Sequence, residues 1–233
     1  MTGDAEPSGT FVQAIALGLD LAWRRQPDPE RHDDGCRFAD AVDSSTAAGV
    51  RTFSYSSIGL EPGVDVMLWR MAGSIEALEA GAAAVLRSGL GRWLEVRHSF
   101  IGRIGPSQYV RKPTEQEQSV FDGERMRYLV VYPFTKSAEW YLLSREARQG
   151  VMNEHIRVGR GYPTIRQALA YSFGVDSQDF VVAYETDDLA AFGDLVRELR
   201  GTESRRSTVS DTPILLGIHR PVSEILALLG APA

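Results

Sequence analysis

The feature that most constrains this 233-residue chain is an internal repeat, because the same order of expected elements occurs twice. Between residues 11 and 104, strand-like and helical stretches follow one another as strand, helix, strand, strand, helix, strand. After a polar stretch the same order begins again at Tyr128. Two copies of one β-α-β-β-α-β unit predict an α+β protein with helices packed on antiparallel sheets.

Turn and cap residues set the limits of the expected elements. Glu61, Pro62 and Gly63 read as a hairpin turn, and Ser74 is placed to cap a helix. The first copy has expected strands at 11–17, 51–60, 65–71 and 94–104 and helices at 28–47 and 74–88. The second has expected strands at 128–134, 165–173, 179–185 and 213–218 and helical signals at 139–160, 187–200 and 222–229.

These elements predict four parts along the chain. Residues 1–10 are expected to be a disordered tail, residues 11–105 an N-terminal ferredoxin-like half, and residues 128–233 a C-terminal one. The stretch 106–127 between the halves is polar and lacks periodicity, so it is interpreted as a linker. The duplicated ferredoxin-like halves are expected to form a dimeric α+β barrel within one chain.

Composition excludes several kinds of protein. The net charge of −6 disfavours nucleic-acid binding, because phosphate-binding surfaces carry excess Lys and Arg. Cys36 is the single cysteine, which rules out an intrachain disulfide and a cysteine-based metal site. The first ten residues lack a signal-type apolar core, and no run approaches 18 apolar residues. We therefore expect a cytoplasmic protein without a membrane span.

Among the histidines, His155 is the strongest candidate for a chemical role. On the expected helix it shares one side with Val151, Val158 and Tyr162. Two interpretations remain open: a core histidine bonded to a backbone carbonyl, or a neutral imidazole presented to a metal. A tetrahedral zinc site is poorly supported, because no second His or Cys stands at ligand spacing. One axial histidine is sufficient for heme iron, since the porphyrin supplies four nitrogens.

Ordered segments of the chain resemble the chlorite dismutase superfamily. They lie at 128–134, 139–143, 152–155, 159–163, 171–174, 180–189 and 211–214, with looser matches at 22–25, 67–69 and 98–100. The resemblance covers about residues 11–220 and implies a duplicated ferredoxin-like fold, often assembled as a pentamer. It also implies heme or coproheme in the second half, with His155 as the iron ligand. Glu203 is the candidate carboxylate to support His155, or else an exposed acid at a helix end.

Within that superfamily the chain looks closest to the coproheme decarboxylases. Chlorite-decomposing members carry a distal arginine, and the matching position is Gln167, although a shift of one residue would substitute Arg166. Because neighbouring strand residues point to opposite faces, one of these two at most can face the iron. Tyr132 matches the tyrosine that is oxidised beside a propionate, or is a core aromatic residue. Lys136 is a candidate propionate or hydrogen-bonding partner, and Trp140 is expected to pack near the porphyrin.

The resemblance implies a heme-dependent oxidoreductase that decarboxylates coproheme III to heme b with hydrogen peroxide. One departure is that residues 114–119 contain no histidine, whereas some decarboxylases carry a distal histidine on the linker. The rival interpretations are another heme enzyme of this fold, either chlorite-decomposing or dedicated to a specialised metabolite, and a heme-binding protein without turnover. The residues that would bind the propionates stay unassigned.

Overall fold

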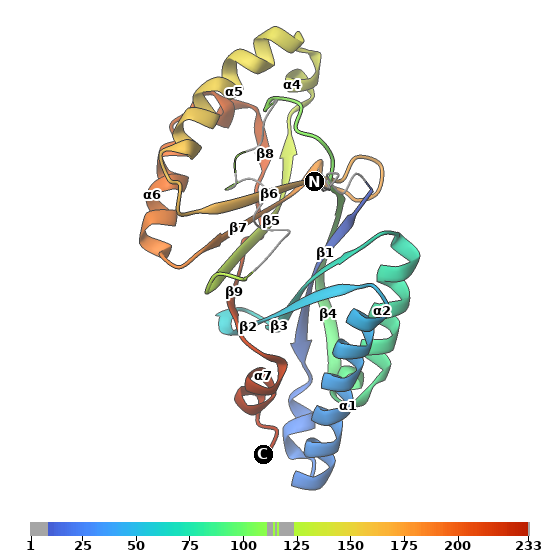
Figure 1. Cartoon of the computed structure of the whole chain (residues 1–233). Helices are drawn as coiled ribbons and strands as arrows, with labels where there is room; N and C mark the ends of the chain where they lie inside the picture. The colour runs from blue at the N-terminus through green and yellow to red at the C-terminus, as the bar shows by residue number, and fades with distance from the viewer. Residues whose placement is uncertain (1–8, 111–113, 115, 117–123, 233) are drawn as a thin grey trace, which may run out of the picture. The chain divides into compact units, whose positions relative to one another are not determined.

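The structure is a computed structural model that describes residues 9–110, 114, 116 and 124–232. Internal contacts divide the chain into unit 1, Met1–Ile104 with Leu215–Ala233, and unit 2, Gly105–Ile214. Both units are mixed α+β with antiparallel strand pairing (Figure 1). Residues 1–8 of the expected tail lie outside the described residues. So do residues 111–113, 115 and 117–123 of the expected linker. Among the described residues, no helix has the length and apolar character to cross a membrane.

In unit 1, β1 (Phe11–Leu19) pairs with β3 (Val64–Ala72) on one side and β4 (Leu94–Arg103) on the other. Next to β3 lies β2 (Arg51–Glu61), and β2 in turn pairs with β9 (Leu215–His219). The helices are α1 (Asp28–Ala47), α2 (Ile75–Arg87) and α7 (Val222–Leu229), with short 3-10 helices η1 (Leu21–Arg25) and η2 (Gly89–Trp93). The order β1–α1–β2–β3–α2–β4 agrees with the expected order of the first copy.

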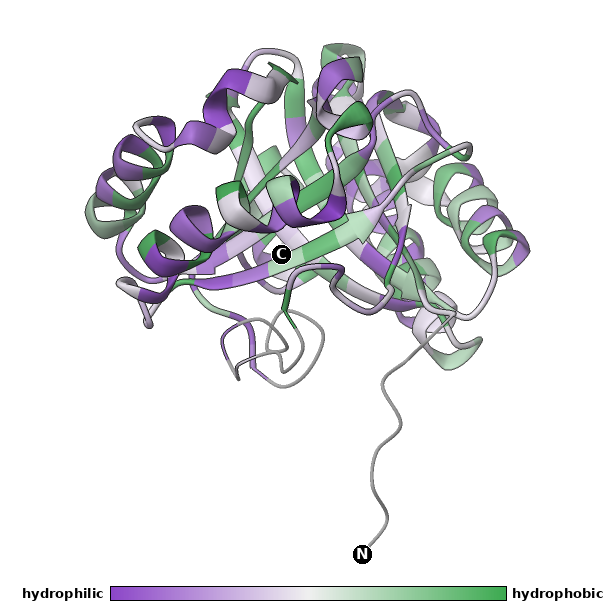
Figure 2. Cartoon of the chain, turned by 90° about the horizontal axis from the view of Figure 1, so that it is seen from above, coloured by the Kyte–Doolittle hydropathy of each residue, from purple (hydrophilic) through white to green (hydrophobic). Residues whose placement is uncertain are grey.

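Local signals account for the hairpin and the second helix of unit 1. Gly63 has a φ of 76° between β2 and β3, a left-handed conformation that glycine adopts without a Cβ penalty. The Ser74 hydroxyl accepts the Ala77 N–H at 3.2 Å and caps α2, as expected. The helices in Figure 2 carry both hydrophobic and hydrophilic residues, as expected for helices that bury one face.

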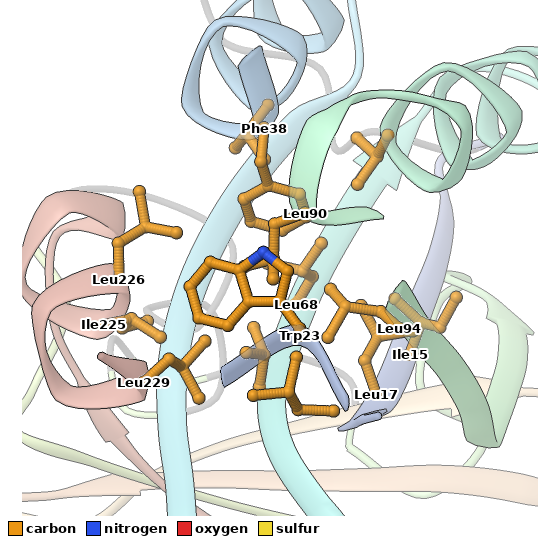
Figure 3. Close-up of a cluster of buried hydrophobic side chains, with 14 residues drawn as sticks. Ile15, Leu17, Trp23, Phe38, Leu68, Leu90, Leu94, Ile225, Leu226 and Leu229 are labelled. Atoms are coloured by element: carbon orange, nitrogen blue, oxygen red, sulfur yellow. The ribbon is translucent and has the colours of Figure 1, made fainter. Parts of the chain in front are cut away.

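The core of unit 1 gathers around Trp23, which is fully buried among side chains from β1, α1, η2 and α7 (Figure 3). Asp34 of α1 is buried beside this core. Its Oδ2 accepts the indole N–H groups of Trp23 and Trp93, both at 3.1 Å, and its Oδ1 accepts Arg92 Nη2 at 3.1 Å. One carboxylate therefore satisfies two indoles and a guanidinium.

Asp34→Ala should lower the free energy of unfolding by about 3 kcal/mol, because two indole N–H groups lose their acceptor. Urea unfolding followed by tryptophan fluorescence measures this change. The neighbouring Asp33 pairs with Arg37 at the surface, where both side chains are largely exposed. Asp33→Ala is the control and should change stability by less than about 0.5 kcal/mol. Equal effects of the two substitutions would contradict the assignment of Asp34 as a structural acceptor.

Unit 2 contains a sheet in the order β6 (Arg166–Tyr171), β7 (Phe180–Thr186), β5 (Tyr128–Lys136) and β8 (Thr208–Ser210). Its helices are α4 (Ala138–Leu142), α5 (Arg145–Arg160) and α6 (Leu189–Arg200), followed by the 3-10 helix η3 (Glu203–Ser207). Figure 1 shows α5 and α6 on the same side of this sheet.

Two elements of unit 2 differ from the sequence expectation. The helical stretch expected at 139–160 is two helices, because Ser144 adopts an extended conformation and its hydroxyl accepts the Ala147 N–H, which starts α5. The strand expected at 213–218 is β9, and it pairs with β2 through Tyr55 and Ser56, so residues 215–232 group with unit 1. The strand that closes on β5 inside unit 2 is instead the short β8.

Candidate functional site

One face of the unit 2 sheet points toward α5 and α6 and carries two of the predicted residues. Tyr132 of β5 lies opposite Val182, and Gln167 of β6 lies opposite Tyr184. Residues directly opposite each other in an antiparallel ladder share a face. Val182 and Tyr184 pack with Leu195 of α6 in the buried cluster of this unit. Tyr132 and Gln167 therefore both belong to the face that the helices cover.

Arg166 belongs to the opposite face of the same sheet. It lies opposite Glu185, and its Nη1 is 4.0 Å from Glu185 Oε2. Glu185 is fully buried, and its other carboxylate oxygen is 3.3 Å from Nη1 of Arg125. Arg166 also donates a hydrogen bond to the Glu124 carbonyl at 2.8 Å. Of the two residues that the sequence left open, Gln167 is the one on the helix-covered face.

His155 projects from α5 and is half-buried. Its Nδ1 is inaccessible to solvent and has no hydrogen-bond partner among the described residues. Burial, followed by the charge of Lys136, lowers the pKa of His155 to about 4. The imidazole is therefore neutral at physiological pH, which is the form that binds metals. The other interpretation was a core histidine bonded to a backbone carbonyl. In the described part of the chain, no backbone carbonyl accepts a hydrogen bond from His155 Nδ1.

The lowered pKa of His155 predicts a pH dependence for the ligand-free protein. An unfolded histidine titrates near 6.5, so between about pH 6.5 and 4 the unfolded chain binds one proton more than the folded chain. The stability contributed by the neutral imidazole is complete above pH 6.5 and is lost as the pH falls toward 4. Urea unfolding of the wild type and of His155→Gln should diverge only below pH 6.5, by up to about 1.4 kcal/mol per pH unit. Parallel pH profiles would contradict the burial of His155.

Lys136 ends β5 in a buried position beside Trp140 of α4. Its Nζ donates to the carbonyl and to the hydroxyl of Ser204, both at 2.8 Å, and lies 4.6 Å from the Trp140 ring centroid. Burial, followed by the charge of Arg205, lowers the pKa of Lys136 to about 8. Ser204 also approaches Met152 on α5 at 3.9 Å. These contacts tie the end of β5 to η3 and to the helix that carries His155.

Glu203 is the first residue of η3, beyond the end of α6. Its side chain is about half exposed, and Oε2 is 3.4 Å from Nε of Arg206. Its backbone N–H donates to the Glu154 carboxylate at 3.0 Å. Within the described residues, the recorded partners of the Glu203 carboxylate do not include His155. A carboxylate support for His155 thus stays a prediction, while Lys136 is the charged group that acts on the imidazole.

Tyr132 has a second tyrosine as its neighbour. The rings of Tyr132 and Tyr184 are stacked with centroids 6.2 Å apart, and Tyr184 also packs against Phe192 of α6 at 5.2 Å. Burial, followed by the charge of Tyr184 and a hydrogen bond between the two phenols, raises the pKa of Tyr132 well above its ordinary value. Tyr132 therefore keeps its proton at neutral pH, and any oxidation of this residue has to release that proton together with the electron.

The apolar surface between α5 and the sheet is incompletely covered by protein side chains. Although α5 carries apolar residues toward the sheet, none of its residues is fully buried, whereas α1 of unit 1 buries Phe38 and Val42. Leu169 is 43% exposed although it shares the helix-covered face with Gln167. Incompletely covered apolar surface together with an unpartnered imidazole fits a flat, apolar ligand that contains a metal. Among the described residues there is no cluster of three or more His, Cys, Asp or Glu that could hold a metal unaided.

Two residues near the site escaped the sequence analysis. Tyr184 follows the strand alternation of β7, but its approach to Tyr132 depends on the strand register. Arg148 stands on α5 two helical turns before His155, a spacing that the sequence already contains. The break at Ser144 had to be known before Arg148 could be placed near the start of a separate helix.

Comparison with known proteins gives consistent matches over most of the chain. A sequence model of the chlorite dismutase family matches residues 32–220. A coproheme decarboxylase of Mycolicibacterium smegmatis is 32% identical over 177 residues, 75% of each chain. A chlorite dismutase of Ideonella dechloratans is 24% identical over 184 residues, 76% of this chain and 65% of that one. The crystal structure of a mutant chlorite dismutase from Candidatus Nitrospira defluvii superimposes with a TM-score of 0.87 at 27% identity, covering 97% of both chains.

Proposed function

Because the chain belongs to the chlorite dismutase family, we propose that unit 2 binds an iron porphyrin between α5 and the helix-covered face of its sheet. We propose further that the protein decarboxylates coproheme III to heme b with hydrogen peroxide. The observation that carries this proposal is the face shared by Tyr132 and Gln167, from which Arg166 is turned away to Glu185. The similarity to a coproheme decarboxylase supports the same choice.

In this proposal His155 holds the iron from α5. Its lowered pKa keeps a lone pair free on the imidazole at neutral pH, as a bond to iron would require. Lys136 and Ser204 fix the end of β5 against η3, and Met152 of α5 contacts Ser204. They would therefore position the helix relative to the sheet. Trp140 packs under Lys136 and keeps water from this side of the site.

The bound iron porphyrin would supply the oxidising power of peroxide at this site. Tyr132 would release an electron and its phenolic proton, and would then recover a hydrogen atom from the propionate. Each propionate, with one hydrogen peroxide and one proton, would give a vinyl group, carbon dioxide and two waters. Tyr184 would orient the Tyr132 phenol through the hydrogen bond between them. Gln167, an uncharged donor and acceptor, would orient peroxide on the sheet side.

A chlorite-decomposing activity has less support from the described residues. The resemblance associates that chemistry with an arginine on the distal side. Arg166 occupies the other face of the sheet, where the buried Glu185 and the Glu124 carbonyl engage it. Turning its guanidinium toward α5 would leave Glu185 with one cation fewer, which is costly for a buried carboxylate.

Titration of the purified protein with iron coproporphyrin III, followed by stepwise peroxide and mass spectrometry of the porphyrin, tests the proposal. Successive loss of two carboxyl groups is the expected result. Coproporphyrin that binds but stays intact would contradict it and would indicate a carrier or an oxidation of another substrate. Bleaching without decarboxylation, combined with chlorite turnover by the heme b form, would support the chlorite-decomposing alternative instead.

We also propose that the two units are duplicated ferredoxin-like halves, that they form a dimeric α+β barrel within one chain, and that the protein acts in the cytoplasm as a homo-oligomer. The similar element order of the two units and the matches to chlorite dismutases support the duplication. A pentamer is the assembly that the family resemblance implies. Light scattering of the purified protein should give a mass near five times 25.7 kDa.

A further inference from the structure

Arg148 is a half-buried arginine of unit 2 for which the described residues provide no acceptor. Its Nε is inaccessible to solvent and lacks a hydrogen-bond partner among the described residues. Arg166 and Arg205 of the same unit pair with Glu185 and Asp211. An Nε–H that is withdrawn from water without an acceptor costs free energy, so a group that accepts its hydrogen bond is expected to bind there.

The helix geometry directs Arg148 to the same side as His155. Seven residues along an α-helix correspond to nearly two full turns, and they separate the two side chains by roughly 10 Å along the axis. Met152, between them on this stripe, contacts Ser204 beneath α5. Arg148 and His155 therefore project from the same side of α5.

Arg148 lies near Tyr141, whose hydroxyl is bonded to the carboxylate of Asp179. Burial, followed by the hydrogen bond to Asp179, raises the pKa of Tyr141, and the charge of Arg148 opposes that rise, which places Arg148 close to Tyr141. The same oxygen of Asp179 accepts the Tyr141 hydroxyl and the Lys136 backbone N–H, both at 2.7 Å. Asp179 thus fixes Tyr141 and the end of β5 rather than neutralising Arg148.

We propose that Arg148 binds a carboxylate on the edge of the porphyrin whose iron His155 holds. This inference rests on the proposed binding of an iron porphyrin in unit 2. A guanidinium pairs with a carboxylate through two parallel hydrogen bonds, so it fixes orientation as well as charge. Arg148 therefore favours porphyrins that carry a carboxylate at the edge near Tyr141, and it sets how the macrocycle is turned about the iron.

Binding titrations with two iron porphyrins test this role. The probes are iron coproporphyrin III and its tetramethyl ester, which has the same ring without charged carboxylates. Arg148→Met should weaken binding of coproporphyrin by about 10- to 100-fold and leave the ester nearly unchanged. Arg157→Met removes the same charge from the exposed opposite side of α5 and is the matched control. It should leave both affinities within about twofold of wild type.

The outcomes separate this inference from the proposed reaction. Equal weakening of both porphyrins by Arg148→Met, or equal weakening of coproporphyrin by both variants, would overturn the carboxylate contact. If the Arg148 effect appears but peroxide releases no carbon dioxide from bound coproporphyrin, the contact stands and the proposed decarboxylation is wrong. If the wild type binds neither porphyrin, the proposed cofactor is wrong and the inference is overturned with it.

Discussion

Replacing His155 by alanine is expected to abolish the iron–imidazole bond of the porphyrin-loaded protein. The imidazole is neutral, half-buried and without a hydrogen-bond partner for Nδ1 among the described residues, so no other described interaction competes for it. Loss of an outer partner typically costs a metal site about 10- to 100-fold in affinity, and loss of the ligand itself should cost more. Electron paramagnetic resonance and the visible spectrum of the loaded protein would report the loss of the axial nitrogen.

The control for this substitution is His32→Ala. His32 lies exposed on α1 of unit 1, where its ring is 3.4 Å from the Pro232 carbonyl and 3.6 Å from Cys36. Its removal should leave porphyrin affinity and spectra unchanged. Added imidazole should partly restore the spectroscopic signal of the iron–imidazole bond in His155→Ala. The shorter side chain leaves room for free imidazole between α5 and the porphyrin. An unchanged axial signature in His155→Ala would show that another residue holds the iron.

Tyr132→Phe is expected to reduce peroxide-driven decarboxylation by at least about 100-fold, since the phenol is the group proposed to be oxidised. Phenylalanine keeps the ring against Tyr184 and removes one oxygen. Porphyrin affinity should therefore change little, and the free energy of unfolding should fall by about 1 kcal/mol through the lost hydrogen bond. Mass spectrometry of the porphyrin after a fixed peroxide dose measures the first effect.

Tyr128→Phe makes the same change at the first residue of β5, whereas Tyr132 lies in the middle of that strand. The Tyr128 ring lies 5.3 Å from the guanidinium of Arg127 and far along the strand from Tyr132. It should decarboxylate coproporphyrin like the wild type. If Tyr132→Phe retained full activity as well, a different residue would have to carry the oxidation, and Tyr184 would be the first to replace.

Much of the fold could be predicted because its determinants are local. The turn at Gly63 and the cap at Ser74 place a hairpin and a helix from a few neighbouring residues. The break at Ser144 was missed because the helical pattern continues on both sides of it, and only the cap geometry shows the interruption. The strand that pairs with residues 215–219 could not be predicted from neighbouring residues either, because β2 lies more than 150 residues earlier in the chain.

The candidate site was predictable in part for a similar reason. Strand alternation established that Gln167 and Arg166 face opposite ways, but choosing between them needed the register with β7 and the burial of Glu185. His155 could be placed on a helix face from its spacing alone. The contact of Lys136 with Ser204 depends on how η3 follows α6, which no periodic pattern encodes.

The return of the chain to unit 1 also determines when that unit can be completed during synthesis. Residues 11–103 supply four of its strands early, but β9 and α7 leave the ribosome only after all of unit 2 has been made. Ile225, Leu226 and Leu229 of α7 fill the core around Trp23, so a nascent unit 1 exposes that apolar surface throughout the translation of unit 2. Unit 2, whose residues are contiguous, can finish folding first although it is encoded second.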